Sequence, residues 1–299
     1  MKIKTSIPRK TFIAGNYIFL VLTGVICLLP FINLFAISFS SQAEVSLGNV
    51  SFIPRDFTLS SYNFIIENTD FIRAFFVSIL RVLLGLIVNL SLIVLVAYPL
   101  SKNNKQLPFR NVYAWFFVIT ILFNGGLIPT FMIVRYTGLL DSIWALVLPG
   151  ALPVFSMLVV MNFLRSLPAE LEEAALIDGA NYLQILIYII LPVVKPALAT
   201  VALFSIVFHW NSWFDGMIYI QRPENLPLQS YLQTIIINPG VLFSTNINIS
   251  ADLAETLRQI SPRTIRAAQL LIAAIPVLIV YPFLQKYFST GLVLGSVKG

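Results

Sequence analysis

Long runs of apolar residues constrain the fold of this 299-residue chain more than any other feature. A helix needs roughly 20 mainly apolar residues to cross the hydrocarbon core of a membrane. The segments that reach this length lie at about residues 12–38, 71–99, 111–135, 142–165, 184–215 and 265–288. We therefore predict an all-α, polytopic membrane protein with six transmembrane helices, in which residues 1–299 form a single transmembrane domain.

Composition agrees with this prediction, because 58% of the residues are hydrophobic, only 11% are charged, and the mean hydropathy is +0.87. Such values lie far outside the range of soluble proteins. The net charge of +6 does not indicate nucleic-acid binding, since the basic residues are scattered and flank the apolar runs. We expect membrane lipids, and no nucleic acid, among the partners.

The first apolar run is too long for a cleaved signal sequence. It extends from Phe12 to Phe39, whereas the apolar region of a signal peptide has about 7–15 residues. We therefore expect a retained helix. Cys27, the only cysteine, lies within this run, which excludes an internal disulfide and a cysteine metal cluster.

Charge asymmetry predicts the orientation of the chain in the membrane. An even number of crossings places both termini on one side, and a cytoplasmic N-terminus satisfies the positive-inside rule best. The basic residues then assigned to the inner face are Lys2, Lys4, Arg9, Lys10, Lys102, Lys105, Arg110, Arg165, Lys286 and Lys298. We predict a multi-pass cell-membrane protein with cytoplasmic termini and long external loops at 39–70 and 216–264, the latter containing Asn238-Pro239-Gly240.

An acidic segment between the fourth and fifth apolar runs predicts a short helix at the inner face. Ser166 is a candidate cap, Pro168 suits a first turn, and the glutamates that follow favour the positive end of the helix dipole. Gly179 can end this helix in a left-handed conformation, and Pro192 with Pro196 can bend the chain into the next crossing. A helix-turn-helix over residues 168–183 follows, with small residues that allow close approach.

This segment closely resembles the EAA motif of binding-protein-dependent ABC importer permeases. The matching residues are Glu173-Ala174-Ala175-Leu176-Ile177-Asp178-Gly179-Ala180, followed by Ile189-Ile190-Leu191-Pro192 and Pro196. Softer similarity elsewhere, in Gly138-Leu139 with Asp141 and in the ending from Gln285 to Gly299, resembles the carbohydrate permeases of the maltose-type group. The resemblance implies the type I importer permease fold with a cytoplasmic coupling helix.

The resemblance implies that the chain is the permease subunit of an ATP-driven importer, which moves a sugar or oligosaccharide into the cell by alternating access. Its implied partners are a second, non-identical permease, two ATP-binding subunits and an extracytoplasmic solute-binding protein, with a homodimer as the alternative. The residues it assigns to ATPase coupling are Glu173, Ala174, Ala175, Asp178, Gly179, Leu191 and Pro192. No residue is assigned a catalytic or metal-binding role.

The chain contains no Gly-x-x-x-x-Gly-Lys-Ser/Thr phosphate loop. We therefore expect no cofactor in this chain and a partner ATPase that binds ATP and magnesium. The chain itself is expected to be a transport subunit and not an enzyme.

Polar residues at membrane depth are costly and are therefore candidates for the solute path. Those we select are Arg81, Asn89, Asn124, Trp210, Asn211, Trp213 and Asp215. Aromatic faces next to hydrogen-bonding groups suit a sugar, but an aromatic belt at the membrane interface is an alternative reading of residues 210–215. Small residues at 124–126 are equally consistent with close helix packing.

Two other classes of membrane protein, ion-coupled secondary transporters and intramembrane enzymes, are less consistent with the sequence. An ion-coupled secondary transporter would need several acids within the membrane, and few candidates exist. An intramembrane enzyme would need nucleophiles or metal ligands, and the chain has one cysteine and one histidine. An ABC permease for a solute other than a sugar is the main alternative.

Overall fold

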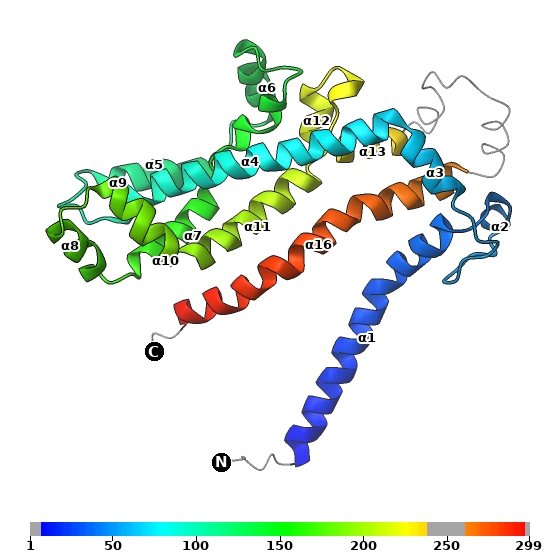
Figure 1. Ribbon diagram of the computed structural model, residues 1–299, viewed down its shortest axis with the longest axis horizontal. Helices are drawn as coiled ribbons and strands as arrows, with labels where there is room; N and C mark the ends of the chain where they lie inside the picture. The colour runs from blue at the N-terminus through cyan, green and yellow to red at the C-terminus, as the bar shows by residue number, and fades with distance from the viewer. Residues whose placement is uncertain (1–6, 238–260, 297–299) are drawn as a thin grey trace. The chain divides into compact units, whose positions relative to one another are not determined.

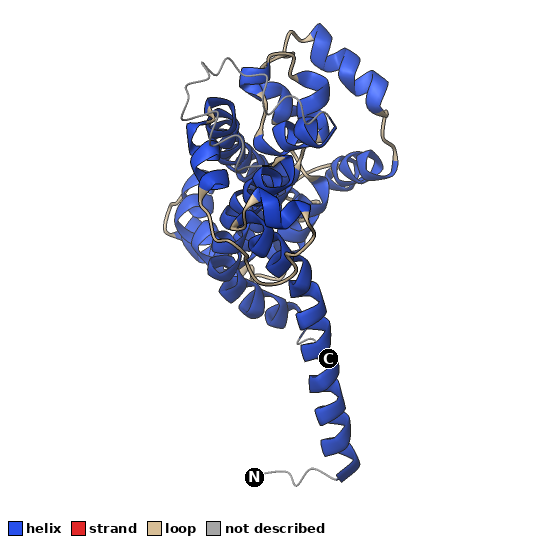
Figure 2. Ribbon diagram, turned by 90° about the vertical axis from the view of Figure 1, so that its right-hand side faces the viewer, coloured by secondary structure: helices blue, strands red, loops and turns tan. Residues whose placement is uncertain are grey.

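The computed structural model describes residues 7–237 and 261–296, and the side chains within residues 8–237 and 261–282. In these residues helices are the only regular elements apart from one isolated antiparallel bridge between Ser40 and Phe57 (Figure 2). The predicted all-α fold is confirmed. The external-loop segment Asn238-Pro239-Gly240 and the last three residues lie outside the described residues.

Contacts within the chain define two compact units. The first comprises the described residues within 1–69 and 234–275, and the second those within 70–233 and 276–299. Three helices pass from one unit into the other, namely α4 (Thr69–Ser101), α13 (Leu228–Ile237) and α16 (Pro262–Ser296). The single transmembrane domain stays a prediction.

The first unit contains α1 (Ile7–Ser38), α2 (Gln42–Ser46), α3 (Ser60–Glu67) and the first part of α16. A small core joins the end of α1 to α2 and α16, through Ala36, Val45 and Ala267. Most of α1 instead exposes large apolar side chains, with Phe12 74% and Phe19 66% exposed. Such a surface suits surrounding lipid.

The second unit is built around α4. It also contains α5 (Arg110–Leu122), α6 (Leu127–Tyr136), η1 (Ile143–Leu146), η2 (Leu148–Gly150), α7 (Val154–Arg165), α8 (Glu170–Ile177), α9 (Tyr182–Gln184), the π-helix η3 (Ile185–Ile190), α10 (Leu191–Val193), α11 (Lys195–Asn211), α12 (Phe214–Tyr219), η4 (Pro223–Asn225) and most of α13. Its core forms where α4, α7, η3 and α11 lie side by side (Figure 1). Ile93, Met157, Ile185 and Val201 are buried there.

Three described helices are long and apolar enough to cross a membrane unaided, at residues 8–38, 69–101 and 262–282. Three further crossings are possible if each bent pair of helices counts as one. The pairs bend by 114° between α5 and α6, by 50° before α7, and by 80° before α11. The segments predicted at 111–135, 142–165 and 184–215 are therefore each divided into two parts.

The breaks follow from backbone chemistry. Gly126 separates α5 from α6 with a φ of +85°, a left-handed value that glycine adopts without a Cβ clash. Pro153 directly precedes α7, and Pro196 lies in the first turn of α11. Proline suits these positions because a first-turn N–H has no partner within its own helix.

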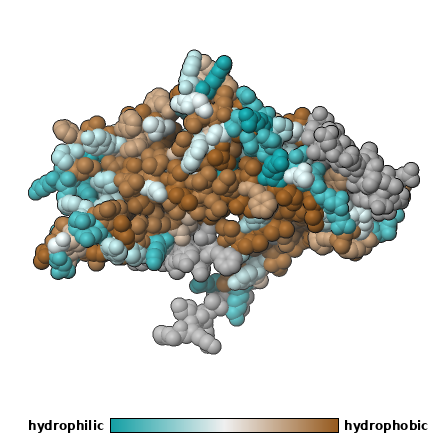
Figure 3. Space-filling view, turned by 45° about the horizontal axis from the view of Figure 1, so that its top comes forward, coloured by the Kyte–Doolittle hydropathy of each residue, from teal (hydrophilic) through white to brown (hydrophobic). Residues whose placement is uncertain are grey.

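Apolar residues make up most of the surface visible in Figure 3. Large apolar side chains are exposed in both units, which is unusual for a soluble protein. The surface supports the prediction of a membrane protein.

Close approach of α4 and α11 depends on Gly85, which lies on the buried face of α4. A Cβ at this position would overlap the imidazole ring of His209 on α11. His209 is only 1% exposed and has little room to withdraw.

We predict that Gly85→Ala destabilises the protein by about 2 kcal/mol, the usual cost of overpacking, although alanine is the better helix former. Thermal unfolding in detergent measures the effect. Gly24→Ala is the matched control, because nothing lies within 4 Å of a Cβ at that helical position. Equal melting temperatures for the two variants would contradict the packing argument.

Candidate functional site

The turn after α8 has the geometry that the sequence predicts for Gly179. This residue has a φ of +83°, and its N–H donates to the Leu176 carbonyl at 3.1 Å. The next N–H, from Ala180, donates to the carbonyl of Ala175 at 3.0 Å. This pair of bonds is the Schellman motif, which satisfies the last carbonyls of a helix and reverses the chain.

A capping box begins the following helix. The Asn181 Oδ1 atom accepts a hydrogen bond from the backbone N–H of Gln184, and the Gln184 Oε1 atom accepts one from the N–H of Asn181, both at 2.9 Å. The chain then continues through α9 into the π-helix η3 and α10. Together the two motifs define a helix-turn-helix. The capping box was not predicted from the sequence, although asparagine and glutamine stand at the right spacing.

The start of α8 differs from the prediction. Ser166 ends α7, where its hydroxyl donates to the Phe163 carbonyl at 2.7 Å, so the prediction that it caps α8 is wrong. The helix begins at Glu170, preceded by Ala169 without a side-chain cap. Its first turn instead carries three glutamates, which interact favourably with the positive end of the helix dipole.

The helix-turn-helix exposes most of the residues assigned to ATPase coupling. Glu173, Ala174, Asp178 and Gly179 are exposed, as is Pro192, whereas Leu191 is partly buried. Only Ala175 within α8 is buried, and it packs into the core of the second unit.

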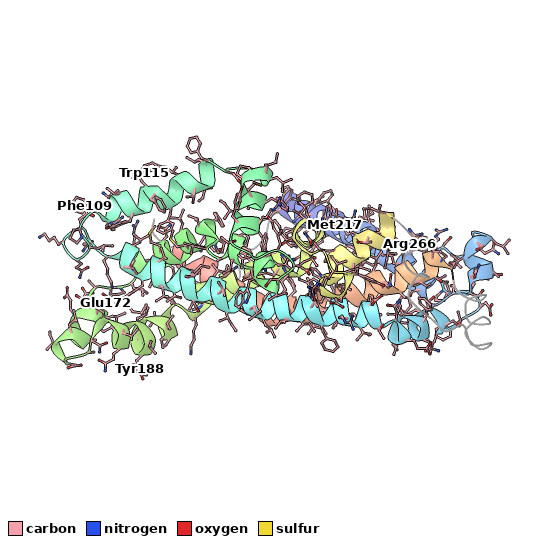
Figure 4. The ribbon with its side chains drawn as sticks, turned by 90° about the horizontal axis from the view of Figure 1, so that it is seen from above. Phe109, Trp115, Glu172, Tyr188, Met217 and Arg266 are labelled. Atoms are coloured by element: carbon pink, nitrogen blue, oxygen red, sulfur yellow. The ribbon has the colours of Figure 1, made fainter. Side chains whose placement is uncertain are left out.

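Large apolar side chains accompany these acidic and small residues on the surface. Ile177 is 87% exposed and Tyr188 is 75% exposed, the latter on the same segment as Glu172 in Figure 4. A protruding turn with acidic, small and apolar groups is suited to contact with another macromolecule.

An ion pair of a buried arginine and a partly buried aspartate joins α4 to the first turn of α12. The guanidinium of Arg81, 0% exposed, contacts both carboxylate oxygens of Asp215, one of them at 3.2 Å. It also donates to the main-chain carbonyls of Ser212 at 3.1 Å and Leu146 at 3.4 Å. Because a charge within the membrane needs such compensation, these contacts explain how Arg81 is accommodated.

A second polar group lies two turns further along α4. The Asn89 side-chain amide donates to the Ser205 hydroxyl at 3.0 Å, and its nitrogen lies 3.4 Å from Nε2 of His209. All three side chains are at most 3% exposed. The structure thus places Asn89 in contact with α11, and Arg81 in contact with α12, the end of α11 and the end of η1.

The other candidates for the solute path lie in different surroundings. Trp210 is buried against Phe75, with ring centroids 5.7 Å apart. Asn211 is exposed and donates to the Val207 carbonyl of its own helix at 3.0 Å. Trp213 is 42% exposed, and Asn124 accepts from the N–H of Gly126 at 2.9 Å in the break after α5.

A third cluster ties two loops together outside the candidate crossings. Asp141, at a φ of +60°, accepts from the backbone N–H of Arg222 at 3.1 Å and of Gln221 at 3.2 Å. Its other oxygen lies 2.9 Å from Nε of Arg222. The backbone bond from Arg222 is the main cause that holds the pKa of Asp141 below its ordinary value. This carboxylate therefore stays charged and fixes the loop pair.

Among the residues that the structure describes, no group of three or more His, Cys, Asp or Glu side chains could hold a metal ion.

Residues 111–293 match the family described as the binding-protein-dependent transport system inner membrane component. The chain is also similar to the polygalacturonan/rhamnogalacturonan transport system permease protein YtcP of Bacillus subtilis (strain 168), at 39% identity over 95% of this chain and 96% of that protein. The maltodextrin transport system permease protein MdxG of the same organism is 26% identical over 95% of each chain.

Among solved structures, the chain matches part of a bacterial ABC transporter involved in the import of the acidic polysaccharide alginate. The TM-score is 0.85 and the identity 34%, over 96% of this chain and all of the matched chain. The similarity therefore extends over nearly the whole length of the chain.

We predict that Gly179→Val loosens the turn after α8 by about 1–2 kcal/mol, because a β-branched residue resists the left-handed conformation. No atom lies within 4 Å of a Cβ at this position, so the cost comes from the backbone alone. Hydrogen exchange of the amides at 178–181 should accelerate. Gly179→Asn is the control, since asparagine tolerates this conformation, and equal exchange in both variants would contradict the argument.

We also predict that Asp215→Ala destabilises the second unit by about 3 kcal/mol, because it leaves the buried Arg81 guanidinium without its counter-charge. The melting temperature in detergent reports the loss. The double variant Arg81→Met with Asp215→Leu removes both charges and should recover most of the stability. A double variant as unstable as Asp215→Ala would show that packing, and not the unpaired charge, is responsible.

Proposed function

The chain belongs to the family of binding-protein-dependent transport system inner membrane components, and we propose that it imports an oligosaccharide as one permease subunit of an ATP-driven transporter. The family predicted from the EAA motif is thereby confirmed, and with it a membrane-embedded transport subunit rather than an enzyme.

The observation that carries the mechanism is the exposed helix-turn-helix around Gly179. We propose that α8 and this turn dock on an ATP-binding subunit, with Glu173, Ala174, Asp178 and Gly179 at the contact. The buried Ala175 and the partly buried Leu191 would hold the segment on the rest of the permease. ATP and magnesium would be bound by that partner subunit, and movement of the segment would drive alternating access.

Oligosaccharides are proposed as the solute because relatives over the full length of the chain carry names that refer to polysaccharides or maltodextrin. The alginate importer supports the same class. A solute-binding protein outside the cell and a second, non-identical permease would complete the transporter. A solute other than a sugar is the alternative.

We propose that the solute path includes the polar and aromatic residues that the sequence predicts for it on α4 and near the end of α11. Arg81, Asn89 and Trp210 are buried in this conformation, so they would reach a solute only after α4 and α11 separate. Trp213 and Asn211, which are exposed, would be accessible without this change. The Asp215 carboxylate is paired with the Arg81 guanidinium in this conformation.

Basic residues at one end of the second unit support the proposed orientation. Arg110 donates to the carbonyl of Lys102 at 3.4 Å, and Arg165 donates to the carbonyl of Leu100 at 3.1 Å. All of these residues lie near the C-terminal end of α4, and α8 is attached at the same end. The positive-inside rule favours the cytoplasm for this end, and both termini would lie on that side.

We predict that the purified permease brings down ATP-binding subunits, and that its reconstituted complex takes up labelled oligosaccharide only with ATP. The probes are oligogalacturonides, alginate oligomers and maltodextrins, each offered with the solute-binding protein. Uptake that proceeds without ATP, and stops when an ionophore collapses ion gradients, would contradict the proposal.

A charge reversal tests the docking surface within the same experiment. Glu173→Lys should weaken binding of the ATP-binding subunits at least tenfold, because a like or unpaired charge at an interface costs about 1.4 kcal/mol or more. Glu67→Lys is the control, since Glu67 is also an exposed glutamate but ends α3. Equal loss in both variants would indicate a general charge effect.

A further inference from the structure

An ion pair connects α8 directly to the C-terminal end of α4. Lys102 follows the last residue of α4, and its ammonium group contacts both carboxylate oxygens of Glu172 on α8. The same ammonium lies 4.0 Å from the ring centroid of Tyr98, one turn back on α4. Lys102 thus contacts the Glu172 carboxylate of α8, and Tyr98 of α4 positions the Lys102 ammonium.

This pair is better shielded than an ordinary surface ion pair. The side chains of Lys102 and Glu172 are only 13% and 18% exposed. Solvent and salt weaken such a pair less than a fully exposed one, and the aromatic ring stabilises the ammonium further. We therefore expect this ion pair to stabilise the contact between α8 and α4 more than a fully exposed ion pair would.

Few other contacts anchor α8. Within the helix only Ala175 is buried, and the remaining side chains are exposed apart from the intermediate Glu172. The neighbouring arginines, Arg110 and Arg165, donate to main-chain carbonyls at the end of α4 from α5 and α7, not from α8. The polar connection between α8 and the end of α4 is thus concentrated at the Glu172 carboxylate, which Lys102 contacts directly and which also interacts with Tyr98.

The helix α4 can carry a displacement over a long distance. It is a continuous helix of 33 residues with a proline only in its last turn. At 1.5 Å per residue, Arg81 lies roughly 30 Å along the helix from Lys102. Asn89 contacts α11, and Arg81 contacts the end of α11 and α12, so displacement of α4 would act directly on these contacts.

We infer that the Lys102 and Glu172 ion pair is the positioning link that makes α4 follow the movement of α8. The inference rests on the proposed function, in which an ATPase displaces α8. Without the pair, α8 keeps its Schellman turn and its docking residues, but its movement is no longer transferred to the helix that holds the membrane-depth polar contacts.

The test measures whether α8 and α4 move together. In a Cys27→Ser background, spin labels are attached at Ala169→Cys, just before α8, and at Leu95→Cys on the exposed face of α4. The complete transporter is placed in lipid nanodiscs, and the distance between the labels is compared without nucleotide and with ATP and vanadate. The single distance distribution should be unchanged by nucleotide in the parent protein.

The variants isolate the ion pair. Glu172→Gln should give a distribution that shifts or splits when ATP and vanadate are added, and Lys102→Met should do the same. Glu170→Gln, which removes a neighbouring exposed charge from α8, should behave like the parent. The exchanged pair, Lys102→Glu with Glu172→Lys, should restore the single distribution, which a merely structural role for either residue would not do.

Each other result has a defined meaning when complexes with equal ATPase content are compared. The link is overturned if nucleotide already changes the distance in the parent, if Glu172→Gln behaves like Glu170→Gln, or if the exchanged pair fails to restore the distribution. Loss of the ATPase from the Glu172→Gln complex would also overturn it, because the pair would then act on docking. A parent that retains no ATPase would overturn the proposed function itself.

Discussion

Hydrocarbon offers no hydrogen-bond partner, and this constraint governs the arrangement of the described helices that are apolar enough to cross a membrane. Unbroken helices such as α1 and α4 satisfy their backbone groups internally. The broken segments need glycine or proline at the break and additional partners nearby. Arg81 follows the same rule on the side-chain level, since its guanidinium is surrounded by a carboxylate and by carbonyls that helix ends leave available.

Those available carbonyls link the breaks to the polar contacts. Ser212 ends α11, and Leu146 ends a 3-10 turn, so both present carbonyls without a partner in their own helices. Arg81 uses these groups, and in doing so it connects α4 to two separate breaks. Arg81 of the unbroken helix α4 thereby stabilises the ends of two broken segments.

The sequence was informative where one residue type has a single physical role. Apolar length predicted the helices, and Gly179 predicted the left-handed turn, because few other residues adopt that conformation. The partners of Arg81 and Asn89 could not be predicted, since Asp215, Ser212 and Ser205 lie more than a hundred residues away in the chain. Ser166 was misassigned because a serine can cap the next helix or bond back to the helix it ends.

The π-helix η3 gives the distance between Gly179 and Pro192 a structural meaning. A π-helical stretch holds an additional residue relative to an α-helix of the same hydrogen-bonded length. One more residue in an uninterrupted α-helix would turn its two ends by about 100° relative to each other. The π-helical stretch from 185 to 190 takes up its additional residue without that turn. The interval between Gly179 and Pro192 therefore holds one residue more than an α-helix of the same length, and the helices on either side keep their relative rotation.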